Sequence, residues 1–64
     1  MDSGWIPCSE RLPEEYTNVM ASFVHGAVTE LIYSKNGMFK GMYGDYTTKV
    51  ITAWMPLPKP YKGE

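Results

Sequence analysis

The first clear pattern along the chain is an alternation of apolar and polar positions over residues 17–24. Val19, Ala21 and Phe23 fall on one side of an extended backbone there, and the side chains between them fall on the other. A period of two is typical of a β-strand with one buried face. The alternation therefore predicts a strand over residues 17–24, with these three side chains directed to the core.

A turn signal at His25-Gly26 separates this strand from a second run over residues 27–34. The run is rich in β-branched and aromatic side chains, which favour strands. A helix within this run is the alternative, and it would make the fold a small α+β domain. Thr29, Tyr33 and the short loops on both sides favour the strand.

The dipeptide Asn36-Gly37 is the strongest local signal in the chain, because both residues tolerate the positive φ of a type I′ hairpin turn. It predicts a hairpin whose returning strand covers residues 37–44. Phe39 and Tyr43 then lie on one side of that strand.

Beyond the hairpin, the pattern predicts a loop over residues 45–49 and a last strand over residues 50–55. Gly41, inside the returning strand, indicates a bulge or the close approach of a large ring. Together these elements predict a mainly β fold: a four-stranded antiparallel meander, with the flanking Trp/Pro segments packed on one face.

The two flanking segments share a pattern. WIPCSERLP near the start and AWMPLPKP near the end each place a tryptophan two residues before a proline, and each contain Leu-Pro. Extended Leu-Pro segments have preset φ angles and lose little entropy on docking. We therefore expect the two indoles to clamp the termini together over the sheet, in preference to PLPKP acting as a proline ligand for a partner. The sequence leaves open whether the Ile6-Pro7 and Met55-Pro56 bonds are cis or trans.

With these two segments the chain resembles the family catalogued as domain of unknown function 551, small proteins found largely in phages and prophages of bacteria. The resemblance runs over nearly the whole chain, and its specific part is the two ends. They match the family's pattern at Trp5, Ile6, Leu12, Pro13, Trp54, Met55, Pro56, Leu57, Pro58 and Pro60. Ala53 stands where many members carry histidine, so no role of that histidine carries over. Cys8 stands where the family tends to carry valine, which indicates a small buried side chain.

The 64 residues are expected to form a single small domain, residues 1–64, with a thin core. One cysteine and one histidine argue against an internal disulfide and a cysteine-based zinc site, so no metal and no cofactor is expected. The two Trp, five Tyr, two Phe and five Met must supply the core, with or without the help of a partner chain.

Six basic against seven acidic side chains give a net charge of −1. This balance argues against a duplex nucleic-acid binder, which needs a basic stripe to offset phosphate charge. No apolar run approaches the roughly 20 residues of a membrane span, and no signal peptide is recognisable. We therefore expect no membrane association and a location in the cytoplasm of the host cell.

Candidate catalytic groups are few. Cys8, His25 and Asp45 could supply a nucleophile, a base and an orienting group, but their spacing matches no local signature. Glu14 and Glu15 are adjacent in extended chain and point apart, which is typical of a solvated rim. The glycines form no phosphate-binding loop followed by a helix. We therefore expect a protein that is not an enzyme.

Binding surfaces are more informative. Five tyrosines cannot all be buried in so small a body, and tyrosine is enriched at protein interfaces. We predict a partner-binding site formed by Tyr43, Asp45, Tyr46, Lys49 and Tyr61. The alternative is that these tyrosines fringe the core with their hydroxyl groups in water. With the nearby lysines, the same aromatics could instead form a platform for single-stranded nucleic acid.

The resulting hypothesis is a small, non-enzymatic, phage-encoded interaction protein. It would bind and inhibit a host or defence protein, for example as an anti-CRISPR inhibitor of a CRISPR effector. The resemblance contributes the phage association and assigns no activity. The alternatives are a nucleic-acid or nucleotide-binding accessory module and a structural domain that self-associates, for instance as a homodimer through an exposed strand edge.

Overall fold

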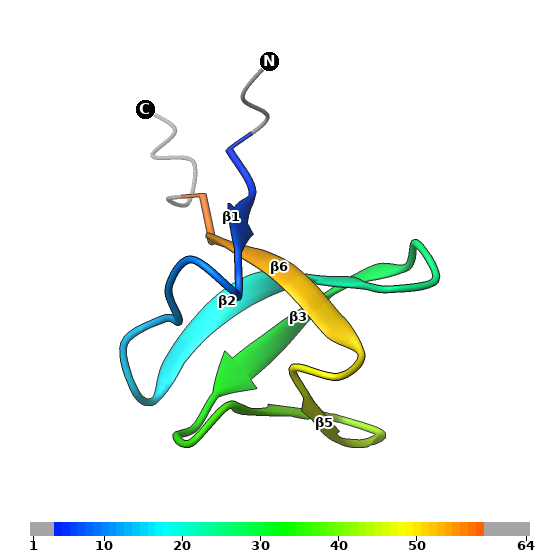
Figure 1. Ribbon diagram of the computed structural model, residues 1–64. Helices are drawn as coiled ribbons and strands as arrows, with labels where there is room; N and C mark the ends of the chain where they lie inside the picture. The colour runs from blue at the N-terminus through cyan, green and yellow to red at the C-terminus, as the bar shows by residue number, and fades with distance from the viewer. Residues whose placement is uncertain (1–3, 59–64) are drawn as a thin grey trace, which may run out of the picture.

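Backbone pairing in the computed structural model, which describes residues 4–58, forms one antiparallel sheet with the strand order β1-β6-β2-β3-β4-β5 (Figure 1). The strands are β1 (Ile6–Pro7), β2 (Thr17–Phe23), β3 (Val28–Tyr33), β4 (Met38–Gly41), β5 (Gly44–Thr47) and β6 (Ile51–Pro56). The mainly β prediction is confirmed, whereas the predicted number of four strands is wrong, since the sheet has six. The described residues include no helix that is long and apolar enough to cross a membrane.

β2 and β3 form the centre of the sheet and pair along the whole of β3. The alternation predicted for β2 is present: Val19 and Ala21 are buried, and Phe23 packs against the core at the end of the strand. In β3, Leu31 and Tyr33 are buried on the same side. The helical alternative for this run is wrong, because its backbone groups pair with β2 instead of with one another.

The turn between β3 and β4 is the one that the dipeptide Asn36-Gly37 predicted. Both residues have positive φ, 56° for Asn36 and 78° for Gly37. The Gly37 N–H donates to the Tyr33 hydroxyl oxygen over 2.9 Å. This hydrogen bond uses the polar end of a ring that is otherwise buried, so Tyr33 stabilises the core and the turn together.

The third predicted strand, over residues 37–44, is in fact two strands. β4 ends at Gly41, Met42 and Tyr43 form a turn, and β5 begins at Gly44 and covers most of the segment expected to be a loop. Tyr43 therefore projects from a turn instead of sharing a strand face with the core. Gly44 has a φ of 149°, a backbone conformation that residues with a side chain rarely adopt. A glycine at this position therefore lets the chain reverse direction, although the pattern of apolar and polar residues over 37–44 gives no sign of a turn.

Gly41 has a packing role of its own. A Cβ atom at this position would lie 2.5 Å from Leu31 Cδ2. The close approach predicted at this glycine is therefore present. An aliphatic side chain of β3 makes the tightest contact, and the Tyr46 ring also lies nearby, with its Cε2 atom 3.7 Å from the same position.

The two Trp/Pro segments lie together at one edge of the sheet, as paired strands and not as a cover over one face (Figure 1). Ile6 of β1 is opposite Trp54 of β6. Pairing as strands is more favourable than packing on the face of the sheet, because it satisfies backbone N–H and C=O groups that an extended segment would otherwise leave unpaired. Trp54 is 7% exposed, and its Nε1–H donates to the Arg11 carbonyl oxygen over 3.0 Å. The peptide bonds before Pro7 and Pro56 are both trans.

The sheet is curled, so that its concave side encloses one small core (Figure 1). The Tyr46 ring of β5 meets the Phe23 ring of β2 edge-on, with 4.9 Å between ring centroids, although these strands are not neighbours in the sheet. Each large side chain that is fully buried contributes about 1.5–3 kcal/mol. The buried hydrophobic side chains are those of Val19, Ala21, Leu31, Tyr33, Phe39, Ile51 and Trp54.

Candidate partner-binding site

β3 has one edge that is only partly covered. It pairs with β2 along its whole length, but β4 pairs with it only at Ile32 and Tyr33. β4 ends at Gly41, which lies beside Leu31, and the chain then turns away into β5, so residues 28–30 have no neighbouring strand on that side within the described chain. An uncovered edge of this kind presents backbone N–H and C=O groups that lack a strand partner.

The direction of these groups follows from the hydrogen bonds around β3. On the β2 side, the Tyr33 carbonyl oxygen accepts a hydrogen bond from the Tyr16 N–H over 2.6 Å. On the β4 side, the Ser34 N–H donates to the Met38 carbonyl oxygen over 2.9 Å. Successive residues of an antiparallel strand direct their backbone groups to opposite sides. The backbone N–H and C=O groups of the odd-numbered residues of β3 therefore point to β2. Those of Val28 and Glu30 point to the uncovered edge.

A hollow of about 730 Å³ lies between this edge and the β4–β5 turn. This volume is within the range of about 300–1,000 Å³ that is usual for ligand pockets. Met42 and Tyr43, on the turn, are each 90% exposed. Methionine and tyrosine are among the side chains enriched at protein interfaces. We call this hollow the edge groove, and its lining includes Thr29, Glu30, Ile32, Met42, Tyr43 and Tyr46.

Two opposite charges stand at the edge groove. Glu30 Oε2 accepts a hydrogen bond from Asn18 Nδ2 over 2.9 Å, and the carboxylate makes no ion pair with the described residues. Lys40 also lines the groove, and it lies opposite Asp45 in the register of β4 and β5. One carboxylate and one ammonium do not make the basic surface that phosphate groups require, so this site favours a partner other than nucleic acid.

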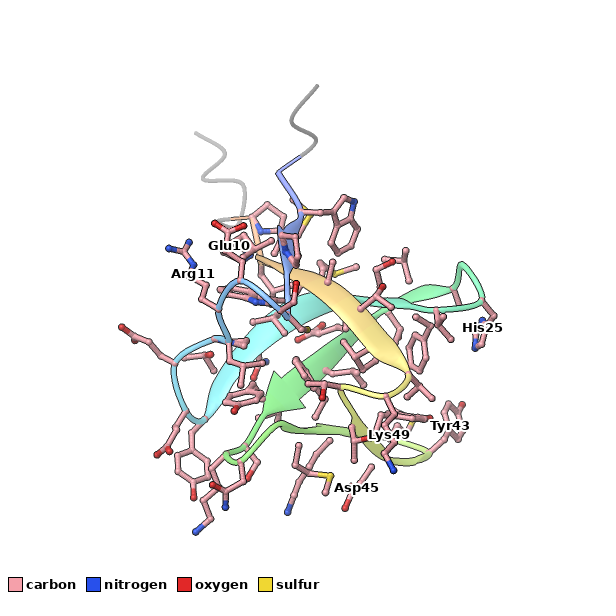
Figure 2. The ribbon with its side chains drawn as sticks, in the orientation of Figure 1. Glu10, Arg11, His25, Tyr43, Asp45 and Lys49 are labelled. Atoms are coloured by element: carbon pink, nitrogen blue, oxygen red, sulfur yellow. The ribbon has the colours of Figure 1, made fainter. Side chains whose placement is uncertain are left out.

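The edge groove brings together two of the residues predicted to bind a partner, Tyr43 and Tyr46. Tyr43 projects from the β4–β5 turn (Figure 2). Tyr46 lines the groove from the core side, where its ring contacts Phe23. Asp45 and Lys49 are not part of its lining: Asp45 points to the opposite face of β5 from Tyr46, and Lys49 lies in the turn between β5 and β6. Tyr61 lies outside the described residues.

Met42 and the uncovered edge beside Glu30 were not predicted from the sequence. The sequence did carry a signal for this turn, since two glycines flank Met42 and Tyr43 in GMYG and glycine weakens a strand. The short pairing between β3 and β4 had no such signal. The length of this pairing depends on where β4 ends in the folded sheet, and the pattern of residues along the chain does not indicate that.

The residues considered for catalysis lie on three different elements. Cys8 follows β1, its N–H donates to the β6 backbone over 2.9 Å, and burial raises the pKa of its thiol, which disfavours the reactive thiolate. His25 is in the β2–β3 turn, where its ring stacks on Phe23 with 5.3 Å between centroids, and Asp45 is on β5. Within residues 4–58, no three His, Cys, Asp or Glu side chains form a group that could hold a metal ion. That the protein is not an enzyme stays a prediction.

A family comparison covers almost the whole chain. A model of the family described as "Protein of unknown function (DUF551)" matches residues 4–62. The matched range includes every strand of the described sheet and the whole edge groove. Searches of curated proteins and of solved structures found no match.

Proposed function

From the premise that the chain belongs to the DUF551 family of proteins of unknown function, we propose that the protein acts by binding another protein, without catalysing a reaction. The edge groove is the binding site in this proposal. The observation that carries it is the pair of turn residues Met42 and Tyr43, each 90% exposed beside an uncovered strand edge.

Met42 and Tyr43 offer a large side-chain area that a partner can bury. A tyrosine that becomes fully buried removes roughly 150–250 Å² from water, which is on the order of 4–6 kcal/mol gross at about 25 cal/mol per Å². In the free protein Tyr43 and Met42 realise little of this gain, because both are almost completely exposed. A partner that covers them recovers it, and tyrosine is among the residues that most often dominate the binding energy of an interface.

In its narrower form, the proposal is that the protein is encoded by a phage and inhibits a host or defence protein, for example a CRISPR effector. Inhibition then results from covering a surface of the target, which requires no catalytic group. The short chain and the resemblance of its two ends to a family found largely in phages and prophages support this form.

The test is capture of a partner from bacterial lysate by the immobilised protein, followed by measurement of the Kd between the two purified proteins. Tyr43→Ala and Met42→Ala should each raise the Kd by about 5- to 30-fold, the effect of interface residues that contribute about 1–2 kcal/mol. Tyr16→Ala is the matched control, because Tyr16 is also an exposed tyrosine in a turn but lies at the other end of β3. This control should leave the Kd unchanged.

Thermal unfolding of each variant shows whether its fold is retained. The proposal fails if the double variant of Met42 and Tyr43 binds the captured protein with the parental Kd. It also fails if Tyr16→Ala weakens binding as strongly as Tyr43→Ala, or if the purified protein turns over a substrate.

A further inference from the structure

We infer that the partner contributes an extended segment, which adds to the uncovered edge of β3 as a further antiparallel strand. This inference rests on the proposed function and specifies the chemistry of the partner at the edge groove. The segment occupies the position that β4 would take if β4 continued beyond Gly41.

The hydrogen-bonding groups at the edge select a polypeptide. Val28 and Glu30 each direct an N–H and a C=O there, and no described strand pairs with them on that side. Alternate residues of a strand are about 6.6–6.8 Å apart, and a second strand presents matching acceptors and donors at the same spacing. Nucleic acids and sugars have no such alternation of donors and acceptors along their backbones. The edge therefore favours strand addition by an extended peptide.

The side chains that line the groove determine the polarity of one residue of the segment, the residue opposite Thr29. Directly opposite residues of an antiparallel pair carry their side chains on the same face. Thr29 lies on the concave face of the sheet with Leu31, so the residue opposite Thr29 also points to that face. It then meets Met42, Tyr43 and Tyr46 in the groove and must be apolar.

Glu30 determines the charge of the next residue of the segment, the one that lies opposite it. Its carboxylate receives a hydrogen bond from Asn18 and no ion pair from the described residues, so a lysine or arginine opposite Glu30 completes a cross-strand pair. Val28 is an exposed apolar residue on the same face as Glu30, which favours an apolar residue opposite it. Because the segment runs antiparallel to β3, its order from the N-terminus is basic, apolar, apolar.

The test uses peptides selected on the immobilised full chain from a displayed library of random sequences of roughly ten residues, a length that exceeds an ordinary strand. The strongest binder is synthesised and its Kd is measured. N-methylation of the residue opposite Val28, or of the residue opposite Glu30, should raise the Kd by about tenfold, since each loses one backbone hydrogen bond. N-methylation of the residue between them is the matched control, because its N–H points away from β3.

A charge exchange tests the position opposite Glu30. Glu30→Lys should raise the Kd of the selected peptide by about fivefold, and a peptide with glutamate in place of its basic residue should bind the variant better than the parent. Thermal unfolding of Glu30→Lys shows whether the sheet is intact. A charge exchange that leaves both Kd values unchanged contradicts the assigned register.

The remaining outcomes separate this inference from the proposed function. Strand addition is overturned if N-methylation is tolerated at all three positions, if the peptide binds the Tyr43→Ala variant with the parental Kd, or if no peptide is recovered. In each case the lysate capture decides the proposed function independently. Self-association of the free protein that Glu30→Lys abolishes would assign the edge to a second copy of this chain and overturn the inference as well.

Discussion

At the scale of single residues, Gly41 decides how closely β3 and β4 approach each other. Its position is next to the buried Leu31 side chain, which occupies the space that a Cβ atom would need. The last residue of β4 is therefore a glycine for a reason of packing, and the chain leaves β3 immediately after it. One absent side chain thus contributes both to the core and to the position of the edge groove.

Gly41→Ala is expected to lower the free energy of unfolding by about 1–3 kcal/mol, as overpacking of a core does. The reason is the separation of 2.5 Å between the new Cβ and Leu31 Cδ2. Urea denaturation measures the change. In a Leu31→Ala background the same substitution should cost less than about 0.5 kcal/mol, because the conflicting atoms are gone. An equal cost in both backgrounds would show that the strain has another source.

Cys8 gives a second test at this scale, through pH. Burial raises the pKa of its thiol, so the folded protein holds the thiol proton more tightly than the unfolded chain. The thiol of an unfolded chain has a pKa of about 8.5, and the stability that comes from the neutral thiol is fully present below that pH. It is lost as the pH rises through the higher pKa of the folded state. The free energy of unfolding should therefore decline above about pH 8.5 more steeply in the parent than in Cys8→Val. Parallel curves for the two proteins would contradict this account.

At the scale of elements, a side chain adds to the short backbone pairing between β1 and β6. β1 has only two residues, opposite Trp54 and Ala53 of β6. The Trp54 indole donates to the Arg11 carbonyl oxygen, and the Arg11 guanidinium carbon lies 5.9 Å from the centroid of the same ring. The buried indole therefore ties β6 to the loop that follows β1.

Trp54→Phe is expected to cost about 1–3 kcal/mol of unfolding free energy, because it removes buried area and leaves the Arg11 carbonyl without its indole donor. Denaturant titration measures this loss. Trp5→Phe is the control, since Trp5 is only half-buried, and it should cost less than about 1 kcal/mol. If the two substitutions were equally costly, the indole–carbonyl hydrogen bond would not be what secures this edge.

At the scale of the whole molecule, the curl of one sheet produces both the core and the edge groove. The curl brings Tyr46 of β5 onto Phe23 of β2 across the concave side. The same bend takes the β4–β5 hairpin away from the first half of β3 and leaves the edge there uncovered. The proposed binding site is therefore a consequence of how the core closes.

Stability should depend little on salt. The chain carries a net charge of −1, and the part that the structure describes contains no ion pair. Apolar burial and hydrogen bonds must then supply the stability, and salt screens neither of them as it screens charges. Between about 50 mM and about 500 mM NaCl, the free energy of unfolding from urea titration should change by less than about 0.5 kcal/mol. A larger loss at high salt would reveal a charge network that this account omits.

The elements that could be predicted are those with a local cause. β2 and β3 follow from alternation and β-branched content, and the turn between β3 and β4 follows from two residues that tolerate positive φ. The last strand was also expected within one residue of its bounds, since β6 covers Ile51–Pro56. Of the predicted site, Tyr43 and Tyr46 line the edge groove, because both belong to the hairpin that forms it.

By itself, the sequence determined a mainly β chain, its central strands, one hairpin turn and membership of its family. These features depend on the alternation of apolar and polar side chains, on residues that favour turns, and on the two short Trp/Pro motifs. Each of them is a property of residues close together in the chain. Only the tertiary structure decided that Ile6–Pro7 pairs with β6 as a strand, and that within residues 4–58 the sheet has six strands and leaves half of one edge of β3 uncovered. Those features depend on contacts between distant residues, such as Ile6 with Trp54, and on the space that the closing core leaves beside them.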